Sequence, residues 1–295
     1  AAVAASLRGG PEPVLVRGAL ASTGLAGLPP QEALRRLRAE LAAPVPVLEA
    51  EKENLFVWHR RGPPPEGYRV LSRWTEASLG DVEADPRKQV VAQLPRAGVF
   101  GSLMQEGSVL RALPADLGGS EAQGLSLRVS HEGAVTALHY DSGHSALLQL
   151  EGAKEVLLWP EAELPSLYPY PKSHFMFRRA LADPEYPDAA NLPRFRLSAA
   201  WHARIGRGDL LYFPALWAHH IRTVEGPSVS VGRRFHAKEI PRLPDERAAP
   251  QAVIERVEAL RYAKGFRQPG AGPAAPRPSL LEQGGAGSDD DDDLA

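Results

Sequence analysis

AVTALHYDSGHSALLQLEGAKEVLLWP (134–160) is the stretch that decides the fold of this 295-residue chain. Short apolar segments are separated in it by turn residues, and several of them alternate apolar and polar residues with a period of two, which is typical of β-strands. Segments of the same kind occupy 124–133, 208–214 and 227–235. Regularly spaced short strands favour a sandwich or a barrel. We therefore expect a mainly β fold, a double-stranded β-helix (jelly roll) with flanking helices.

The rest of the chain predicts a supporting segment, an insertion, a helix and a tail. Residues 1–123 are expected to form an α/β segment that flanks the barrel, and 161–205, with six prolines, an insertion within the core at 124–240. An apolar stripe at helical spacing predicts a C-terminal helix in 241–268, and the aspartate-rich 269–295 predicts a disordered acidic tail. In the first segment we expect strands at 11–20, 44–50 and 53–59, helices at 30–41 and 85–94, and a loop at 60–68.

Composition excludes several kinds of protein. The chain has no cysteine, which excludes a disulfide framework, a thiolate metal site and a cysteine nucleophile. Its formal net charge of −2 gives no global basic field of the kind that marks nucleic-acid binding. No apolar run is long enough to span a membrane and no secretory signal is seen, so we expect a cytoplasmic or nuclear protein.

Three residues suggest a metal centre in the predicted barrel. Side chains two apart on a strand share a face, so His139 and Asp141 should point together. His219, which follows 78 residues after Asp141, can complete the set from a distant strand. Two imidazoles and one carboxylate, with other positions open, form the ligand set of non-haem Fe(II) oxygenases. The alternative is a chance H-x-D pair. His220 would point away from the site on a strand, so we expect it not to be a ligand.

A lysine near this set suggests an anion site. Lys154 follows a turn at Glu151-Gly152, and in a hairpin its ammonium would return to the metal pocket. A lysine inside a barrel is costly unless an anion neutralises it. Thr136 could donate a hydroxyl to the same anion. The alternatives are a solvated lysine at a strand end and an ordinary β-branched strand residue.

Three coupled motifs resemble those of the JmjC (cupin-8) hydroxylases. They are T-x-x-H-x-D at 136–141, G-x-K-x-x-x-L-x-P at 152–160 and G-D-x-L-Y-F-P-x-x-W-x-H at 208–219. The resemblance implies a 2-oxoglutarate-dependent non-haem iron dioxygenase that uses O2. It implies that the three residues His139, Asp141 and His219 bind Fe(II), and that Lys154 and Thr136 bind 2-oxoglutarate.

Two positions depart from the family pattern. The family often has asparagine where this chain has Ser145 and, on the final strand, where it has Gly232. Ser145 can still donate one hydrogen bond to the cosubstrate, whereas Gly232 has no side chain to do so. Arg234 could compensate for this loss.

Within the family, the chain looks most like the tRNA wybutosine-synthesising hydroxylases. The likeness rests on ADPRKQVVAQLP (84–95), SLYPYPKS (166–173) and GDLLYFPALWAHHI (208–221). It implies hydroxylation of a hypermodified guanosine of phenylalanine tRNA, with phosphate contacts from the insertion arginines, including Arg178 and Arg179. The ring residues that could stack on an extruded base are Tyr168, Tyr170 and Phe175.

Two other functions remain open. Thr136 matches protein side-chain hydroxylases better, and the near-neutral charge suits a peptide substrate. A degenerate jelly roll that only binds a ligand is the third possibility, against which the intact metal and lysine motifs argue. The C-terminal helix could pack on its own domain or build a homodimer.

Overall fold

The computed structural model describes residues 12–51, 55–57, 66, 68, 70–96, 98–116, 124–195, 200–235 and 247–264. The predicted ends of the core, near 123 and 240, and the predicted acidic tail lie outside these residues, as does most of the predicted loop at 60–68. The division into segments therefore stays a prediction. Among the described helices, none is both long and apolar enough to cross a membrane.

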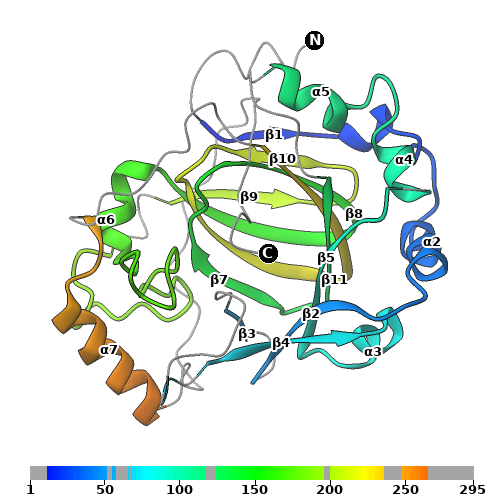
Figure 1. Ribbon diagram of the computed structural model, residues 1–295. Helices are drawn as coiled ribbons and strands as arrows, with labels where there is room; N and C mark the ends of the chain where they lie inside the picture. The colour runs from blue at the N-terminus through cyan, green and yellow to red at the C-terminus, as the bar shows by residue number, and fades with distance from the viewer. Residues whose placement is uncertain are drawn as a thin grey trace.

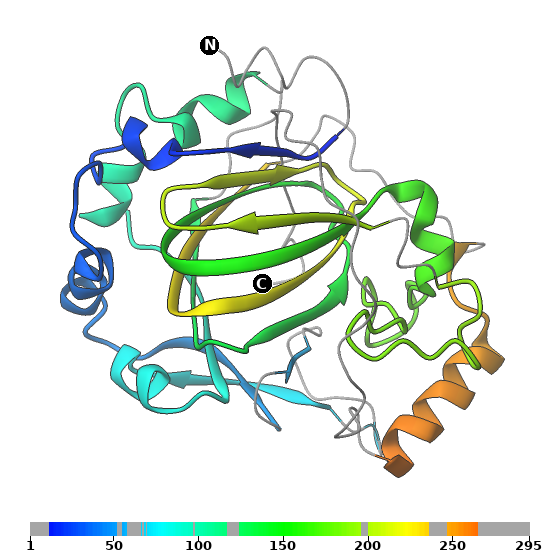
Figure 2. The ribbon, with the colours of Figure 1, turned by 180° about the vertical axis from the view of Figure 1, so that it is seen from behind.

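The strands of the chain form one continuous, mostly antiparallel sheet that wraps around itself (Figures 1 and 2). Its path runs β1-β10-β8-β11-β6-β5-β2-β4, and β9, β7 and β3 complete the opposite side. This architecture is the expected double-stranded β-helix. The strands of the barrel core are β6 (Leu125–Ser130), β7 (Val135–His139), β8 (His144–Trp159), β9 (Trp201–Ile205), β10 (Leu210–Phe213) and β11 (Ala218–Phe235).

Two long strands pass through both sides of the barrel. The first half of β8 pairs with β10, and its second half pairs with β9, while β11 runs beside it along both halves. The sequence predicts a hairpin turn at Glu151-Gly152, and this is wrong, because β8 continues through it. Gly152 has φ +68° and bends the strand there, and a Cβ atom would collide with the carbonyl oxygen of Glu225 on β11. The bend carries the same strand from one side of the barrel to the other.

Strands that precede the core extend the sheet, β3 beside β7 on the opposite side and the others along the main path. They are β1 (Val14–Val16), β2 (Val45–Ala50), β3 (Leu55–Phe56), β4 (Ser72–Ala77) and β5 (Lys88–Gln93). The helix predicted at 85–94 is wrong, because most of that segment forms β5, which pairs with β2 and β6. Val90 and Val91 are both buried, one on each face of the sheet. A strand covered on both faces has a continuous apolar run, which looks like a buried helix in sequence.

Helices cover the sides of the barrel. On one flank lie the helices that precede the core, and on the other lie α6 and α7 with the insertion (Figure 1). The predicted helix at 30–41 corresponds to α2. The α-helices are α2 (Glu32–Glu40), α3 (Leu79–Ala84), α4 (Val99–Leu103), α5 (Val109–Asp116), α6 (Leu164–Leu167) and α7 (Gln251–Lys264).

The insertion and the C-terminal helix pack against each other. Ile254 and Val257 of α7 are buried in the apolar cluster that also contains Tyr168 and Tyr170 of the insertion. The apolar face of α7 is therefore used within the chain, and a homodimer through it stays a prediction. The last five residues of the predicted insertion, 201–205, form β9 and belong to the barrel.

Candidate metal centre

The two histidines of the predicted metal set are direct partners on neighbouring strands. His139 ends β7 and lies opposite His219 on β11. Their ring centroids are 4.0 Å apart, and both side chains are buried. Cross-strand partners of an antiparallel pair project to the same face. Strand register alone therefore places the imidazoles side by side, although 78 residues separate His219 from Asp141 in the chain.

Backbone carbonyl groups fix the orientation of both imidazoles. Nδ1 of His139 lies 2.8 Å from the carbonyl oxygen of Ala137, and Nδ1 of His219 lies 3.1 Å from that of Trp217. A carbonyl only accepts, so each Nδ1–H must donate to it and each Nε2 keeps its lone pair. This is the arrangement by which proteins orient metal-binding histidines.

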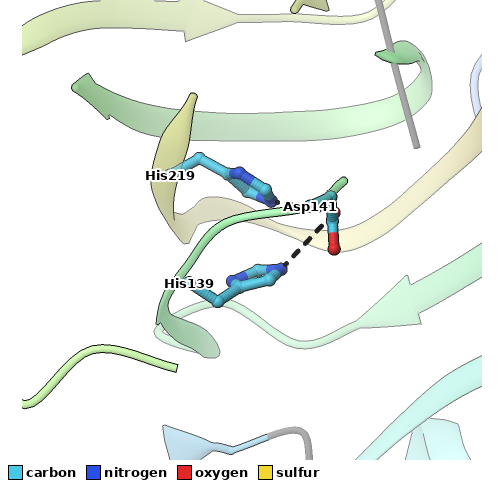
Figure 3. A group of neighbouring side chains, drawn as sticks. All are labelled: His139, Asp141 and His219. Carbon is cyan, nitrogen blue, oxygen red and sulfur yellow. Dashed lines mark ion pairs between the residues drawn. The ribbon is translucent and has the colours of Figure 1, made fainter. Parts of the chain in front are cut away.

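Asp141 supplies the carboxylate just beyond the end of β7. Its Oδ2 is 3.9 Å from Nε2 of His139 and 3.7 Å from Nε2 of His219 (Figure 3). The backbone N–H of Leu216, close before His219, donates to the carbonyl oxygen of Asp141 at 2.8 Å. The sequence places Asp141 on the strand itself, whereas it lies in the bend that follows and still points at the histidines.

The electrostatics of the set favour metal binding. Burial lowers the pKa of His139 well below 6.5, and burial also lowers the pKa of His219. For Asp141, burial alone would raise the pKa, but the guanidinium of Arg234 and the two imidazoles outweigh it and leave the pKa lowered. Neutral imidazoles and an ionised carboxylate are the protonation states that bind a cation.

The geometry fits a small divalent metal ion. One ligand atom from each of the three side chains can be chosen so that all lie within 4.8 Å of one another. Bonds of about 2.1 Å hold adjacent ligand atoms about 3 Å apart, so the side chains need to close by about 1 Å. Two histidines and one carboxylate on one side leave the other coordination positions to non-protein ligands.

Lys154 lies in the same pocket and is buried. Its ammonium donates to the hydroxyl oxygens of Ser130 and Thr223, each at 3.2 Å. No carboxylate pairs with Lys154 within the part of the chain that the structure describes. Burial, with a smaller contribution from Arg128, lowers the pKa of Lys154 to about 7. A buried cation with hydroxyl partners alone fits a site that an anionic ligand completes.

The predicted cosubstrate residues are in this pocket. Thr136, Ser145 and Lys154 line it together with the three metal ligands. Thr136 and Ser145 stay predictions as cosubstrate ligands. Arg234, the suggested substitute for a family asparagine, also lines the pocket, and its Nη2 is 4.0 Å from Oδ2 of Asp141.

Gly232 is glycine for a steric reason. It pairs with Ser126 on β6, and a Cβ atom built on Gly232 would lie 2.7 Å from Oγ of Ser126. Ser126 lines the pocket and therefore fills the space into which a side chain at 232 would project. An asparagine at this position would require the hydroxyl of Ser126 to turn away or residue 126 to be replaced.

Sequence reasoning missed the partners of Lys154 and two polar residues that line the pocket. Ser130 and Thr223, which hold Lys154, are also bonded to each other at 2.9 Å. The side-chain oxygens of Gln89 and Ser230 are buried without a hydrogen-bond partner in the described structure. These residues come from β5, β6 and β11, and only the pairing of these strands with one another and with β8 brings them to Lys154. The sequence predicted strands over Ser130 and Ser230 but not over Gln89 or Thr223, and it gave no partner for any of the four.

His220, which we expected not to be a ligand, lies outside the pocket lining. It is buried and points away from the pocket, and its Nε2 lies 3.1 Å from Oε1 of Glu185 in the insertion.

Comparison with known proteins agrees with the fold and the site. The model of the cupin-like domain family (Cupin_8) matches residues 75–239. A lysine-specific demethylase (JMJ30) of Arabidopsis thaliana is 30% identical over 108 residues, which are 37% of this chain and 25% of that protein. The tRNA wybutosine-synthesizing protein 5 of Gallus gallus is 30% identical over 99 residues, 33% of this chain and 29% of that protein.

One solved structure of low similarity is that of ycfD from E. coli. It has a TM-score of 0.41 and 13% identity, over 92% of this chain and 60% of that chain. The chain spans well under two thirds of the length of the two curated relatives. The family match covers more than half of the chain, and the barrel, the histidine pair and the carboxylate all lie inside it. This chain belongs to the cupin-like (Cupin_8) domain family.

Proposed function

We propose that the protein is a JmjC-type oxygenase that uses Fe(II), 2-oxoglutarate and O2 to hydroxylate a side chain of a protein substrate. The observation that carries the proposal is that the metal set and the buried Lys154 share one pocket. Either feature alone would fit a different kind of site. A zinc enzyme also uses two histidines and a carboxylate, but it needs no buried cation beside them. A dicarboxylate cosubstrate accounts for both features, since one end binds the metal and the other binds Lys154.

Different residues of the pocket would bind the metal and the cosubstrate. His139, Asp141 and His219 would hold Fe(II), and Lys154, with Thr136 and Ser145, would hold 2-oxoglutarate. With both bound, O2 would be the oxidant: one of its atoms would convert a substrate C–H bond to C–OH, and the other would enter succinate, which forms from 2-oxoglutarate with release of CO2. Phe213 and Leu147 are buried apolar residues of the pocket lining and would help to exclude water from it. The protein needs no acid–base residue of its own for this chemistry, because its tasks are geometry and desolvation.

The structure removes part of the argument for tRNA. Tyr168 and Tyr170, which the sequence offered for base stacking, are only 3% and 4% exposed. The hydroxyl of Tyr168 accepts the N–H of Arg194, and the hydroxyl of Tyr170 donates to Glu258 on α7. These rings hold the insertion together and are closed to a base. The likeness to a lysine-specific demethylase, whose name places its action on an amino-acid side chain, supports a protein substrate.

A tRNA substrate is retained as the second candidate, because the chain is equally similar to a tRNA wybutosine-synthesizing protein. The two candidates make opposite predictions for succinate release. Purified, Fe(II)-loaded protein is incubated with 2-oxoglutarate and cell extract that was treated with either nuclease or protease. We expect stimulation that survives nuclease and is lost with protease. Stimulation that survives protease and is lost with nuclease would move the substrate to RNA.

A further inference from the structure

We propose that Glu185 of the insertion is a positioning residue of the metal centre, which fixes the strand that carries His219. This proposal rests on the metal centre described above and adds a residue outside the pocket to it. Glu185 accepts a hydrogen bond from Nε2 of His220 at 3.1 Å and from Nη1 of Arg222 at 2.8 Å. One carboxylate thus binds two residues of β11 that immediately follow the ligand.

The pairing of β11 with β7 is irregular at the place where Glu185 acts. His219 pairs with His139, but Ile221 pairs with Thr136, so β7 holds one extra residue in this interval. Such a bulge interrupts the ladder of hydrogen bonds and lets the strand twist locally. On this side of β11 the ladder therefore gives His220 little support, and Glu185 supplies a restraint at that residue.

The same segment of the insertion also holds the other histidine strand. The backbone N–H of Tyr140 donates to the carbonyl oxygen of Arg178 at 3.0 Å, and that of Ala180 donates to Leu138 at 3.1 Å. Residues 178–185, which we name the bracing segment, therefore bind β7 on both sides of His139 through the backbone and β11 next to His219 through Glu185. The insertion thereby fixes the separation of the two imidazoles.

Burial makes the Glu185 contacts strong enough for this role. The side chains of Glu185 and His220 are 9% and 4% exposed. Hydrogen bonds to a charged acceptor are stronger than neutral ones, and more so when water is excluded. Partners outside the ligand set whose loss disturbs ligand orientation typically cost about 10–100-fold in metal affinity. Glu185 acts through its neighbour His220, so the lower end of that range applies.

The test compares Glu185→Gln with a matched carboxylate on the outer side of the insertion. Glu258 of α7 also accepts two hydrogen bonds, from the hydroxyls of Tyr68 and Tyr170, and among the described residues no hydrogen bond or ion pair joins it to β7 or β11. The two bonds of Glu185 use different oxygens, whereas both hydroxyls bond to Oε1 of Glu258. An amide has one acceptor oxygen, so Glu185→Gln loses one of its two bonds, whereas Glu258→Gln removes the charge and can keep both. Co(II) titration of the full chain measures affinity, and the visible spectrum of bound Co(II) reports the ligand geometry.

We expect Glu185→Gln to weaken Co(II) binding by about tenfold and to change the spectrum, while Glu258→Gln changes neither. The melting temperatures of the two variants serve as the control for general loss of packing. If Glu185→Gln does not fold, Arg222→Gln replaces it, since it removes one of the two donors at a side chain that is 43% exposed, and a smaller weakening is expected. Co(II) affinity and spectrum equal to wild type in Glu185→Gln, or in Arg222→Gln where that variant replaces it, would overturn the positioning role. Failure of the wild type to bind Co(II) would overturn the metal centre itself.

Discussion

The metal ligands and Lys154 lie in one pocket, but the chain holds them by different means. At the metal end, strand register and two carbonyl groups orient the imidazoles, and all three ligands already have the protonation states that a cation needs. At the other end, the ammonium of Lys154 is buried against two hydroxyls and one further cation, Arg128. The metal end is stable without its ligand, whereas the lysine end carries an electrostatic cost until an anion arrives. The two ends should therefore respond in opposite ways to substitution.

Removal of a metal ligand gives the largest expected effect. His139→Ala leaves one imidazole and one carboxylate, so we expect metal binding to be lost and succinate release to fall by at least roughly a thousandfold. Because the replaced imidazole is neutral and buried, the fold should survive, with circular dichroism as the check. His202→Ala, which removes a histidine of β9 outside the pocket lining, is the matched control. Turnover of His139→Ala within tenfold of wild type would contradict the assignment of the metal end.

Substitution of Lys154 should weaken the binding of 2-oxoglutarate without weakening the binding of the metal. Lys154→Met keeps most of the side-chain length and removes the charge. The affinity for 2-oxoglutarate should therefore fall by about 1.5–3 kcal/mol, while Mn(II) affinity stays within twofold. Without ligand, the variant should be more stable than wild type to urea, because the buried charge is gone. Calorimetric titration and urea unfolding measure the two quantities. A less stable variant that binds 2-oxoglutarate normally would assign Lys154 to packing.

The free energies of unfolding of wild type and Lys154→Met should also differ in their pH dependence. The pKa of Lys154 is about 7 in the folded state, against an ordinary value of 10.5. A lysine with a lowered pKa opposes folding fully below its folded pKa, and this opposition fades as the pH rises towards the unfolded value. The advantage of Lys154→Met over wild type should therefore shrink by about 2–3 kcal/mol between pH 7 and pH 9. Urea unfolding at both pH values measures it, and a constant difference would show that the pKa is not lowered.

The sequence predicted the metal end better than the lysine end. The H-x-D pair and the later histidine could be recognised in the sequence because this combination of residues is rare. The period of two in strands predicted that His139 and Asp141 lie on the same face. The partners of Lys154, Ser130 and Thr223, are ordinary strand residues with no signal of their own. They meet because β8 continues through Gly152, where the sequence predicted a turn.

The error at 85–94 has a related cause. An apolar run that is covered on both faces loses the alternation that identifies a strand, and short runs of this kind fit a helix as well. Gln89, which lines the lysine end, lies on this strand, so it could not be assigned to the pocket in advance. The sequence alone shows which residue types are present. The pairing of strands that are distant in the chain decides which of these residues become neighbours.

The smallest expected effect concerns the contact between Gly232 and Ser126. Gly232→Ala places a methyl group 2.7 Å from Oγ of Ser126, and we expect a loss of about 1 kcal/mol in the free energy of unfolding. The second change Ser126→Gly removes the clash and should recover most of this loss. A double-mutant cycle by urea unfolding measures the coupling. Additive effects would mean that the two residues do not compete for the same space.

The most direct test of the account is calorimetric titration of 2-oxoglutarate into the protein without O2, with and without Mn(II). The comparison includes wild type, His139→Ala and Lys154→Met. We predict that wild type binds 2-oxoglutarate tightly only when Mn(II) is present, that His139→Ala loses this dependence on the metal, and that Lys154→Met binds Mn(II) but 2-oxoglutarate only weakly. Binding of 2-oxoglutarate that is the same in all three proteins, or that ignores Mn(II) in wild type, would contradict a shared site for metal and cosubstrate.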